Sequence, residues 1–294
     1  MIVVMGATGN TGRRIVRNLL AAGHAVRALG RSAERLAPFA TLGADVRAGD
    51  SADTGFLADA FRGAIAAYVL LPYEPGVADY HAQQGALGQA VATALRESQV
   101  PYVVNLSSLG AELSSGNGPI ASLHTQEQRL NALSASNVLH LRPGALFENF
   151  ASALAVVDHH GINADGFEPD VAFPMVSTHD VAVAATDALV ARNWRGTVVR
   201  ELLGPRDLSY AEATRILGRR MGRPDLGYAQ LAAHDVIHGL KNAGFSESIA
   251  TLYAELAQAI NAGRIRSLDG RNAANTTPTP FETYADQLVL ASTA

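Results

Sequence analysis

The stretch Met1-Ile-Val-Val-Met-Gly-Ala-Thr-Gly-Asn-Thr-Gly-Arg-Arg-Ile-Val16 decides the fold. Residues 2–5 are apolar, residues 6–12 form a glycine-rich turn, and an apolar-periodic helix follows. Strand, glycine turn and helix in this order are the context that a dinucleotide-binding loop requires. We predict that six residues of the turn bind a dinucleotide: Gly6, Thr8, Gly9, Asn10, Thr11 and Gly12.

The three glycines have separate tasks in such a loop. Gly6 permits the tight turn at the strand end, Gly9 lets the backbone approach a pyrophosphate, and Gly12 lets the helix pack close to the sheet. The pyrophosphate then lies at the helix N-terminus, where unpaired N–H groups and the dipole favour negative charge. Because glycine clusters also mark ordinary turns, the prediction depends on the flanking strand and helix.

The composition is that of an ordinary globular protein. The chain has 294 residues, of which 48% are hydrophobic and 17% charged, and a net charge of −4, which argues against nucleic-acid binding through a basic face. The absence of cysteine excludes disulfides, thiolate metal sites and cysteine nucleophiles. No apolar run is long enough for a signal peptide or a membrane span, so we expect a cytoplasmic protein that does not bind membranes.

The end of the second predicted strand, residues 25–29, indicates which dinucleotide binds. A carboxylate there would bind the ribose hydroxyls of NAD. The chain instead has Gly30-Arg31-Ser32, with Arg35 one turn later, and arginine is the fork-shaped partner of a 2′-phosphate. We therefore predict NADP(H) as the cofactor, bound by Arg31, Ser32 and Arg35; alternatively, Ser32 only caps the following helix.

The next two predicted strands also end in candidate cofactor ligands. Asp50 follows the third strand and either accepts a hydrogen bond from the adenine amine or caps the helix that starts near Thr54. The fourth strand, residues 66–71, runs into a proline-closed loop. We expect Leu71 and Pro72 of this loop beside the cofactor.

The fifth predicted strand, residues 101–106, ends at Ser107, which we place near the nicotinamide. A sixth strand follows at 137–141. Strands that alternate with helices at this spacing imply an α/β fold with a doubly wound parallel sheet of the Rossmann type.

Beyond residue 142 the regular alternation weakens. A helix at 178–189 and a strand at 197–203 are followed by a mostly helical final third, with helices at 210–221, 229–240 and 246–261 and a last one from residue 282. We expect loops at 158–176 and a loose polar segment at 272–280. We thus assign residues 1–150, continued by about 177–204, to an NADP-binding domain, and residues 151–176 and 205–294 to a smaller, mostly helical substrate domain.

Six motifs follow one another along nearly the whole chain. They are GATGNTG at 6–12, Arg31, VVNLSSLG at 103–110, LRPGALFENF at 141–150, HDVA at 179–182 and GPRDLSYAEA at 204–213. In this order they resemble the NmrA-like branch of the atypical short-chain dehydrogenase/reductases. The resemblance implies one of two functions, because the family includes NADPH-dependent quinone reductases and cofactor-binding regulators with little catalysis.

The resemblance also makes residues 141–150 the segment that leads from the sixth strand into the active site. We therefore expect Pro143 at the cofactor and Phe147, Asn149 and Phe150 on the substrate side. For the two phenylalanines, packing in the core is the alternative explanation.

The chain lacks the acid–base pair of typical superfamily members, a tyrosine followed four residues later by a lysine. Lys241 is the only lysine, and Ile237 stands four residues before it. Isoflavone-reductase-like relatives use a lysine in the helix after the fifth strand, and residues 122–130 contain none. Hydride transfer to an electron-poor acceptor needs only a modest hydrogen-bond donor. We therefore predict an NAD(P)H-dependent oxidoreductase that reduces a small quinone-like molecule.

Two residues are candidates for the donor. His124 opens a helix beside the expected crevice, and Tyr73 lies in the loop after the fourth strand. The alternatives are a surface or capping role for His124 and simple packing for Tyr73. The run Asp158-His159-His160 matches no known zinc spacing, so we predict a polar loop and no metal there.

The alternative function is an NADP(H)-sensing regulatory protein with little catalysis. The glycine-rich loop 110–118 and residues 158–176 would then be its switch. A homodimer and a regulatory protein partner both stay open at this point.

Overall fold

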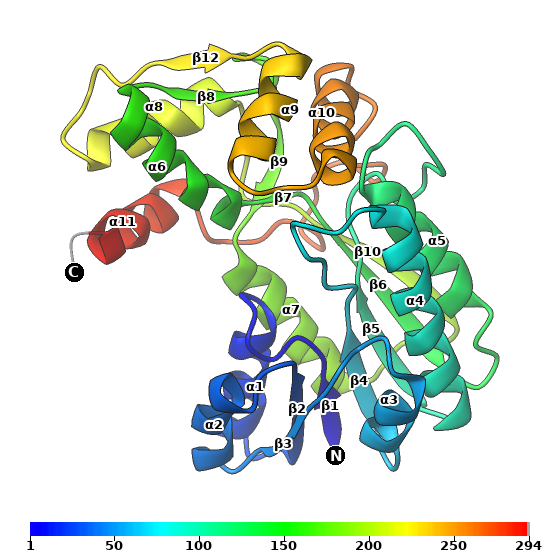
Figure 1. Ribbon diagram of the computed structural model, residues 1–294. Helices are drawn as coiled ribbons and strands as arrows, with labels where there is room; N and C mark the ends of the chain where they lie inside the picture. The colour runs from blue at the N-terminus through cyan, green and yellow to red at the C-terminus, as the bar shows by residue number, and fades with distance from the viewer. Residues whose placement is uncertain (293–294) are drawn as a thin grey trace.

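A seven-stranded parallel sheet lies at the centre of the computed structural model, which describes residues 1–292 (Figure 1). The strand order is β10-β6-β5-β4-β1-β2-β3, so the chain reverses direction across the sheet between β1 and β4. This order confirms the doubly wound Rossmann-type fold. The strands are β1 (Ile2–Val4), β2 (Val26–Gly30), β3 (Asp45–Ala48), β4 (Ala66–Val69), β5 (Tyr102–Leu106), β6 (Asn137–Pro143) and β10 (Thr197–Leu202).

Helices cover both faces of this sheet. One face carries α1 (Gly12–Ala21), α2 (Ala33–Thr41) and α7 (Thr178–Ala191), and the other carries α3 (Thr54–Phe61), α4 (Tyr80–Glu97) and α5 (Ile120–Asn131). Each helix buries an apolar stripe against the strands; in α1 the stripe includes Ile15, Val16 and Leu19. Because both faces are covered, central strands such as β1 and β4 are buried along their whole length.

The remaining elements gather over the carboxyl ends of the strands, in the upper part of Figure 1. Their apolar side chains form a third core cluster, which also takes in residues from the loops after β5 and β6. The division into two domains remains a prediction. The helical elements are a 3₁₀ turn at Phe147–Phe150, α6 (Ala151–His160), α8 (Tyr210–Arg220), α9 (Ala233–Asn242), α10 (Glu247–Asn261) and α11 (Phe281–Ser292).

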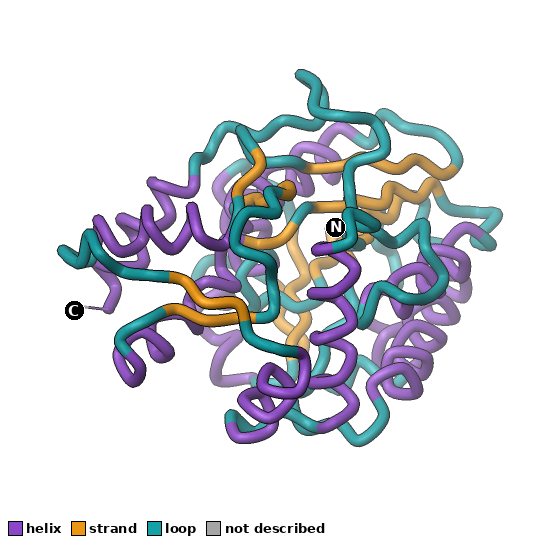
Figure 2. The backbone as a smooth tube through the Cα atoms, turned by 90° about the horizontal axis from the view of Figure 1, so that it is seen from above, coloured by secondary structure: helices purple, strands orange, loops and turns teal. Residues whose placement is uncertain are grey.

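Two small sheets in this part were not predicted. The first joins β7 (Ala145–Leu146), β9 (Phe173–Val176) and β11 (Asp207–Leu208), and the second pairs β8 (Asn163–Asp165) with β12 (Tyr228–Gln230). Figure 2 shows the second pair outside the central sheet.

The prediction of a loop at 158–176 is wrong. It contains the end of α6, with Asp158 and His159, and then β8 and β9. The helix expected from Ala229 begins only at Ala233, because β12 occupies the preceding residues. Both errors have one physical reason: these short strands are stabilised by partners at least 30 residues away, which local periodicity does not reveal.

The segment 272–280 is also more ordered than expected. Leu203 donates its N–H to the Asn275 carbonyl at 2.7 Å, and the Thr277 N–H donates to the Leu203 carbonyl at 2.7 Å. Asn275 and Thr277 are buried. The segment is thus fastened to the end of β10. Within the described residues, no helix is long and apolar enough to cross a membrane.

Candidate active site

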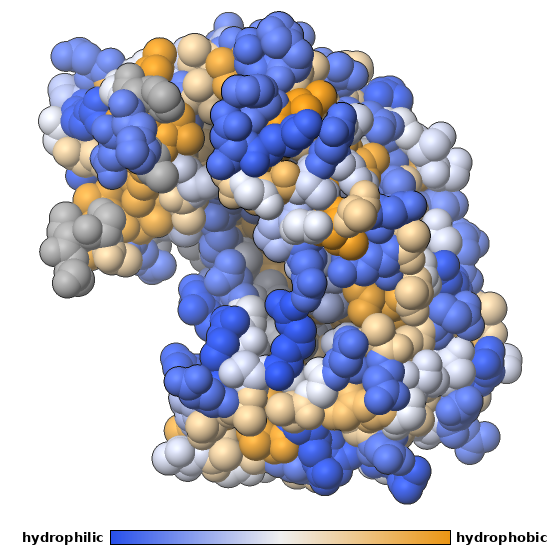
Figure 3. All heavy atoms as spheres, in the orientation of Figure 1, coloured by the Kyte–Doolittle hydropathy of each residue, from blue (hydrophilic) through white to orange (hydrophobic). Residues whose placement is uncertain are grey.

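The glycine loop lies at the carboxyl end of β1, at the point where the strand order reverses. The Met5 N–H donates to the Tyr68 carbonyl at 3.0 Å, and the Ala7 N–H donates to the Leu29 carbonyl at 2.9 Å. The loop is therefore tied to both neighbouring strands, β4 and β2. A deep cleft separates the sheet-bearing part of the molecule from the elements above it (Figure 3), and in such folds ligands bind at the reversal point.

The geometry of the three glycines fits a dinucleotide. Gly6 has a φ of +63°, which favours glycine. A Cβ on Gly12 would lie 2.1 Å from the Gly6 carbonyl oxygen, so α1 approaches the turn as closely as backbone allows. A Cβ on Gly9 would have only that same oxygen within 4 Å, at 3.3 Å. Gly9 thus has open space beside it, where a pyrophosphate can approach the backbone.

The first turn of α1 is not capped by a side chain. Thr11 occupies the N-cap position, but its buried hydroxyl accepts a hydrogen bond from Tyr68 Oη at 3.0 Å and makes no capping bond. Thr8 is half-buried, whereas Gly9 and Asn10 are exposed. The helix N-terminus is therefore left to bind an anion.

The residues predicted for the 2′-phosphate lie beside this loop. Arg35 Nη2 donates to the Thr8 carbonyl at 3.3 Å. Arg31 forms an ion pair with Glu74, which lies in the loop after β4, so that the pair connects the two sides of β1. Ser32 caps α2 by accepting the Arg35 N–H at 3.2 Å, which is the alternative given above.

The other predicted cofactor ligands hold local structure. Asp50 accepts the Ala52 N–H at 2.9 Å, and the cap of α3 is Asp53, so the capping role predicted for Asp50 is wrong. The helix starts one residue after Asp53, which places Asp50 too far upstream to cap it. Leu71 and Pro72 are half-buried in the loop after β4, and the Pro72 carbonyl accepts a hydrogen bond from Gln84 Nε2 at 2.9 Å.

A cavity of about 260 Å³ opens at the carboxyl ends of β5 and β6. Its floor is formed by Leu106, Ser107 and Ser108 after β5 and by Pro143 and Gly144 at the end of β6. Its far wall is aromatic and comes from segments much later in the chain. The aromatic residues are Phe167, Phe173, Tyr210 and Tyr253. The cavity therefore suits a flat, mostly apolar molecule that stacks on aromatic rings.

A buried ion pair supports the floor of the cavity. Glu127 of α5 accepts two hydrogen bonds from Arg142 of β6, at 2.9 and 2.6 Å, and a third from Ser107 Oγ at 2.5 Å. Glu112 adds a second carboxylate to Arg142 at 3.1 Å. Burial lowers the pKa of Arg142, but the hydrogen bond and charge of Glu127 outweigh it and hold the pKa above its ordinary value. Ser107 is thus fixed in place from behind.

A half-buried carboxyl group lies behind the far wall. Asp165, at the end of β8, accepts the Gly166 N–H at 2.7 Å and the Tyr253 hydroxyl at 3.1 Å. Tyr228 donates to the carbonyls of Asp165 and Phe167. Burial raises the pKa of Asp165 to about 6, although the hydrogen bonds from Gly166 and Tyr253 act to lower it. Burial likewise raises the pKa of Tyr210 and of Tyr253 well above the ordinary value.

The residues predicted for catalysis lie outside this cavity. His124 Nδ1 is 2.8 Å from the Ala111 carbonyl oxygen, and Tyr73 is 50% exposed and packs edge-on against Tyr80, which does line the cavity. Of the described residues that line the cavity, none is His124 or Tyr73. Asn149 is in the lining, whereas Phe147 and Phe150 are buried against Phe281 in the core, the alternative stated for them.

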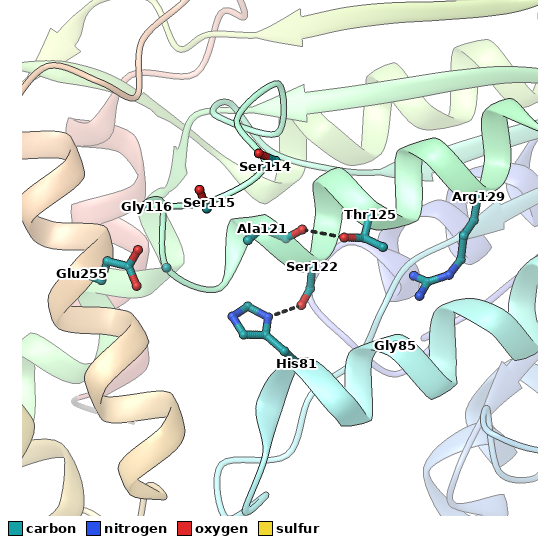
Figure 4. A pocket seen from close by; sticks show the side chains of 11 residues that line it. His81, Gly85, Ser114, Ser115, Gly116, Ala121, Ser122, Thr125, Arg129 and Glu255 are labelled. Atoms are coloured by element: carbon teal, nitrogen blue, oxygen red, sulfur yellow. Dashed lines mark hydrogen bonds between the residues drawn. The ribbon is translucent and has the colours of Figure 1, made fainter.

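A second, polar hollow of about 370 Å³ lies on the other side of α5 (Figure 4). His81 Nδ1 and Ser122 Oγ are 2.6 Å apart there, and Arg129 and Glu255 point into it from α5 and α10. None of the residues predicted for the cofactor, the acceptor or catalysis lines it. Within residues 1–292, no group of three His, Cys, Asp or Glu side chains is arranged to hold a metal ion.

Sequence reasoning missed both the aromatic wall and the residues behind the floor. Glu127 and Arg142 stand 15 residues apart, and nothing in their local sequence marks them as partners. Tyr210 lies in the motif at 204–213, but nothing in that motif marks it as part of the site. Asp165 and Tyr253 lie 88 residues apart and meet only through the small sheet and α10.

Comparisons with known proteins agree with this geometry. The model of the NmrA-like family matches residues 1–285. A (4-alkanoyl-5-oxo-2,5-dihydrofuran-3-yl)methyl phosphate reductase of Streptomyces griseus is 29% identical over 226 residues, which are 76% of this chain and 75% of the relative.

The NADPH-dependent quinone oxidoreductase of Escherichia coli, complexed with NADPH, superposes with a TM-score of 0.83 at 22% identity, over 98% of this chain and 99% of the other. The triphenylmethane reductase of Citrobacter sp. superposes with a TM-score of 0.82 at 21% identity, over 98% and 99%. The fold of this chain is thus shared with both structures over 98% of its length. Since the family model covers residues 1–285 and the chain has the glycine loop and sheet order described above, the protein belongs to the NmrA-like family.

Proposed function

We propose that this protein is an NADPH-dependent reductase that transfers hydride to a flat, conjugated, quinone-like acceptor. The observation that carries the proposal is the aromatic-walled cavity at the ends of β5 and β6. It opens on the sheet edge that also carries the glycine loop, so a nicotinamide at this edge and an acceptor in the cavity would face one another.

The similar proteins support a reductase in general. The Streptomyces relative, the quinone oxidoreductase and the triphenylmethane reductase are all named for reductions of conjugated molecules. The quinone oxidoreductase was solved with NADPH, which supports NADP(H) here.

The residues of the chain supply binding and orientation. The glycine loop and the N-terminus of α1 would hold the pyrophosphate, and Arg31 would bind the 2′-phosphate. When bound, NADPH supplies the hydride. Ser107, fixed by Glu127, would orient the nicotinamide end, and Phe167 and Tyr210 would hold the acceptor ring by stacking.

The direct test follows NADPH oxidation by its near-ultraviolet absorbance, with a panel of quinones and a triarylmethyl dye as acceptors. We expect turnover with at least one of them. Tight NADPH binding without turnover on any acceptor would contradict the proposal and favour the regulatory alternative.

The cofactor assignment has its own test in Arg31→Ala. Loss of the charge-assisted hydrogen bond to the 2′-phosphate should weaken NADPH binding about tenfold or more and leave NADH binding unchanged. Titration of both cofactors by fluorescence measures this, with Arg47→Ala as a control, because Arg47 is an exposed arginine paired with Asp45 on β3. Equal losses for both cofactors would show that Arg31 does not bind the 2′-phosphate.

A further inference from the structure

We propose that Tyr253 donates the proton that accompanies hydride transfer to a neutral acceptor, and that the Asp165 carboxyl group then passes its own proton to the Tyr253 oxygen. This inference rests on the reductase function proposed above. It names a proton donor for a chain that lacks the tyrosine–lysine pair of typical superfamily members.

The geometry places Tyr253 between the cavity and a carboxyl group. Tyr253 lines the cavity, is half-buried, and donates to Asp165 Oδ2 at 3.1 Å. Tyr210, which also lines the cavity, lies next to Tyr253 and stacks on Phe167 with ring centroids 4.2 Å apart. The Tyr253 hydroxyl is thus held by the Asp165 carboxyl group.

The environment of Asp165 keeps it able to carry a proton. The groups that face it are the Gly166 N–H, Tyr253 of α10, Tyr210 of α8 and Tyr228 of β12. Among the described residues, no basic side chain contributes to the pKa shift of Asp165. Because burial in this apolar wall disfavours the carboxylate, a proton is bound at a higher pH than on an exposed aspartate.

The step balances in electrons and protons. One hydride reduces the acceptor with both electrons and oxidises NADPH to NADP⁺, leaving negative charge on the acceptor oxygen. The Tyr253 O–H bond breaks as the acceptor O–H bond forms, and the Asp165 carboxyl passes its proton to the Tyr253 oxygen. The Asp165 carboxylate regains a proton from water when the product leaves. Burial and the neighbouring Asp165 raise the pKa of Tyr253, so its phenolate is unstable. Tyr253 therefore needs Asp165 to return a proton to it.

A cationic dye provides a matched control reaction. A triarylmethyl cation accepts hydride at its central carbon and gives a neutral product, so its reduction needs no proton. A quinone needs one. Tyr253→Phe should therefore slow quinone turnover about 100-fold and leave dye turnover within about twofold of wild type. Tyr284→Phe, a buried tyrosine that does not line the cavity, should change neither rate.

The pH dependence should follow the protonated form of Asp165. Quinone turnover should be full below about pH 6 and fall above it, because Asp165 loses its proton through its pKa of about 6. Asp165→Asn should lower quinone turnover and abolish this inflection, while dye turnover should show neither effect. If the dye is not a substrate, a solvent deuterium isotope effect on quinone turnover that Tyr253→Phe removes serves as the readout.

A measurement without acceptor or cofactor tests the contact itself. Carbon-13 NMR of the Asp165 carboxyl should give a titration near pH 6. Tyr253→Phe should raise this pKa further, because it removes a donor that stabilises the carboxylate. Unchanged quinone turnover in Tyr253→Phe, or equal losses of quinone and dye turnover in this variant, would overturn the relay. Absence of any NADPH oxidation by the wild type would instead contradict the reductase function.

Discussion

The two halves of the candidate site are built in opposite ways. The glycine loop is one continuous stretch, residues 6–12, held by β2 and β4 on either side. The proposed acceptor cavity is assembled from segments far apart in the chain, among them the loops after β5 and β6, β9 and helices α4, α5, α8 and α10. The first half therefore depends on local backbone geometry, and the second on contacts between distant side chains. Mutations in each half should show whether it depends on local backbone geometry or on contacts between distant side chains.

The largest effect is expected at the support of the cavity floor. Glu127→Ala leaves Arg142 buried without its principal partner, and breaking a buried ion pair in this way costs about 3–5 kcal/mol. Thermal or denaturant unfolding measures the loss. Asp59→Ala, which removes the partner of Arg62 in an exposed ion pair, should cost less than about 1 kcal/mol. Equal losses in both variants would show that the cavity does not depend on this long-range contact.

The same difference explains what could be predicted from the sequence. The parallel sheet, its helices and the glycine loop follow from local periodicity and turn chemistry, and the structure confirms them. The aromatic wall could not be found in this way, because Phe167 and Tyr253 are ordinary apolar positions in their own segments. The place of His124 near a helix start predicts a site residue, yet its ring faces the Ala111 carbonyl and does not line the cavity. A helix start fixes where a residue lies along the chain but not which side its ring faces.

A smaller effect is expected at the glycine loop. In Gly12→Ala the new Cβ meets the Gly6 carbonyl, and forced overpacking of this kind costs about 1–3 kcal/mol. Because the clash displaces the turn, NADPH affinity should fall by at least about tenfold. Fluorescence titration and thermal unfolding measure the two losses. Gly239→Ala is the control, since nothing lies near its Cβ and alanine favours the helix that contains it. Unchanged NADPH affinity in Gly12→Ala would separate cofactor binding from this local geometry.

The smallest effect concerns a long-range side-chain contact beside the glycine loop, the ion pair of Arg31 with Glu74. Both side chains are more than half exposed, so the pair contributes only about 0–1 kcal/mol. A 2′-phosphate must compete with the Glu74 carboxylate for Arg31 and is also repelled by it. Glu74→Gln should therefore raise NADPH affinity up to about fivefold, leave NADH affinity unchanged, and lose its effect in the Arg31→Ala background. A fall in NADPH affinity would mean that Glu74 instead holds Arg31 in its binding orientation, and that this half of the site also depends on a long-range side-chain contact.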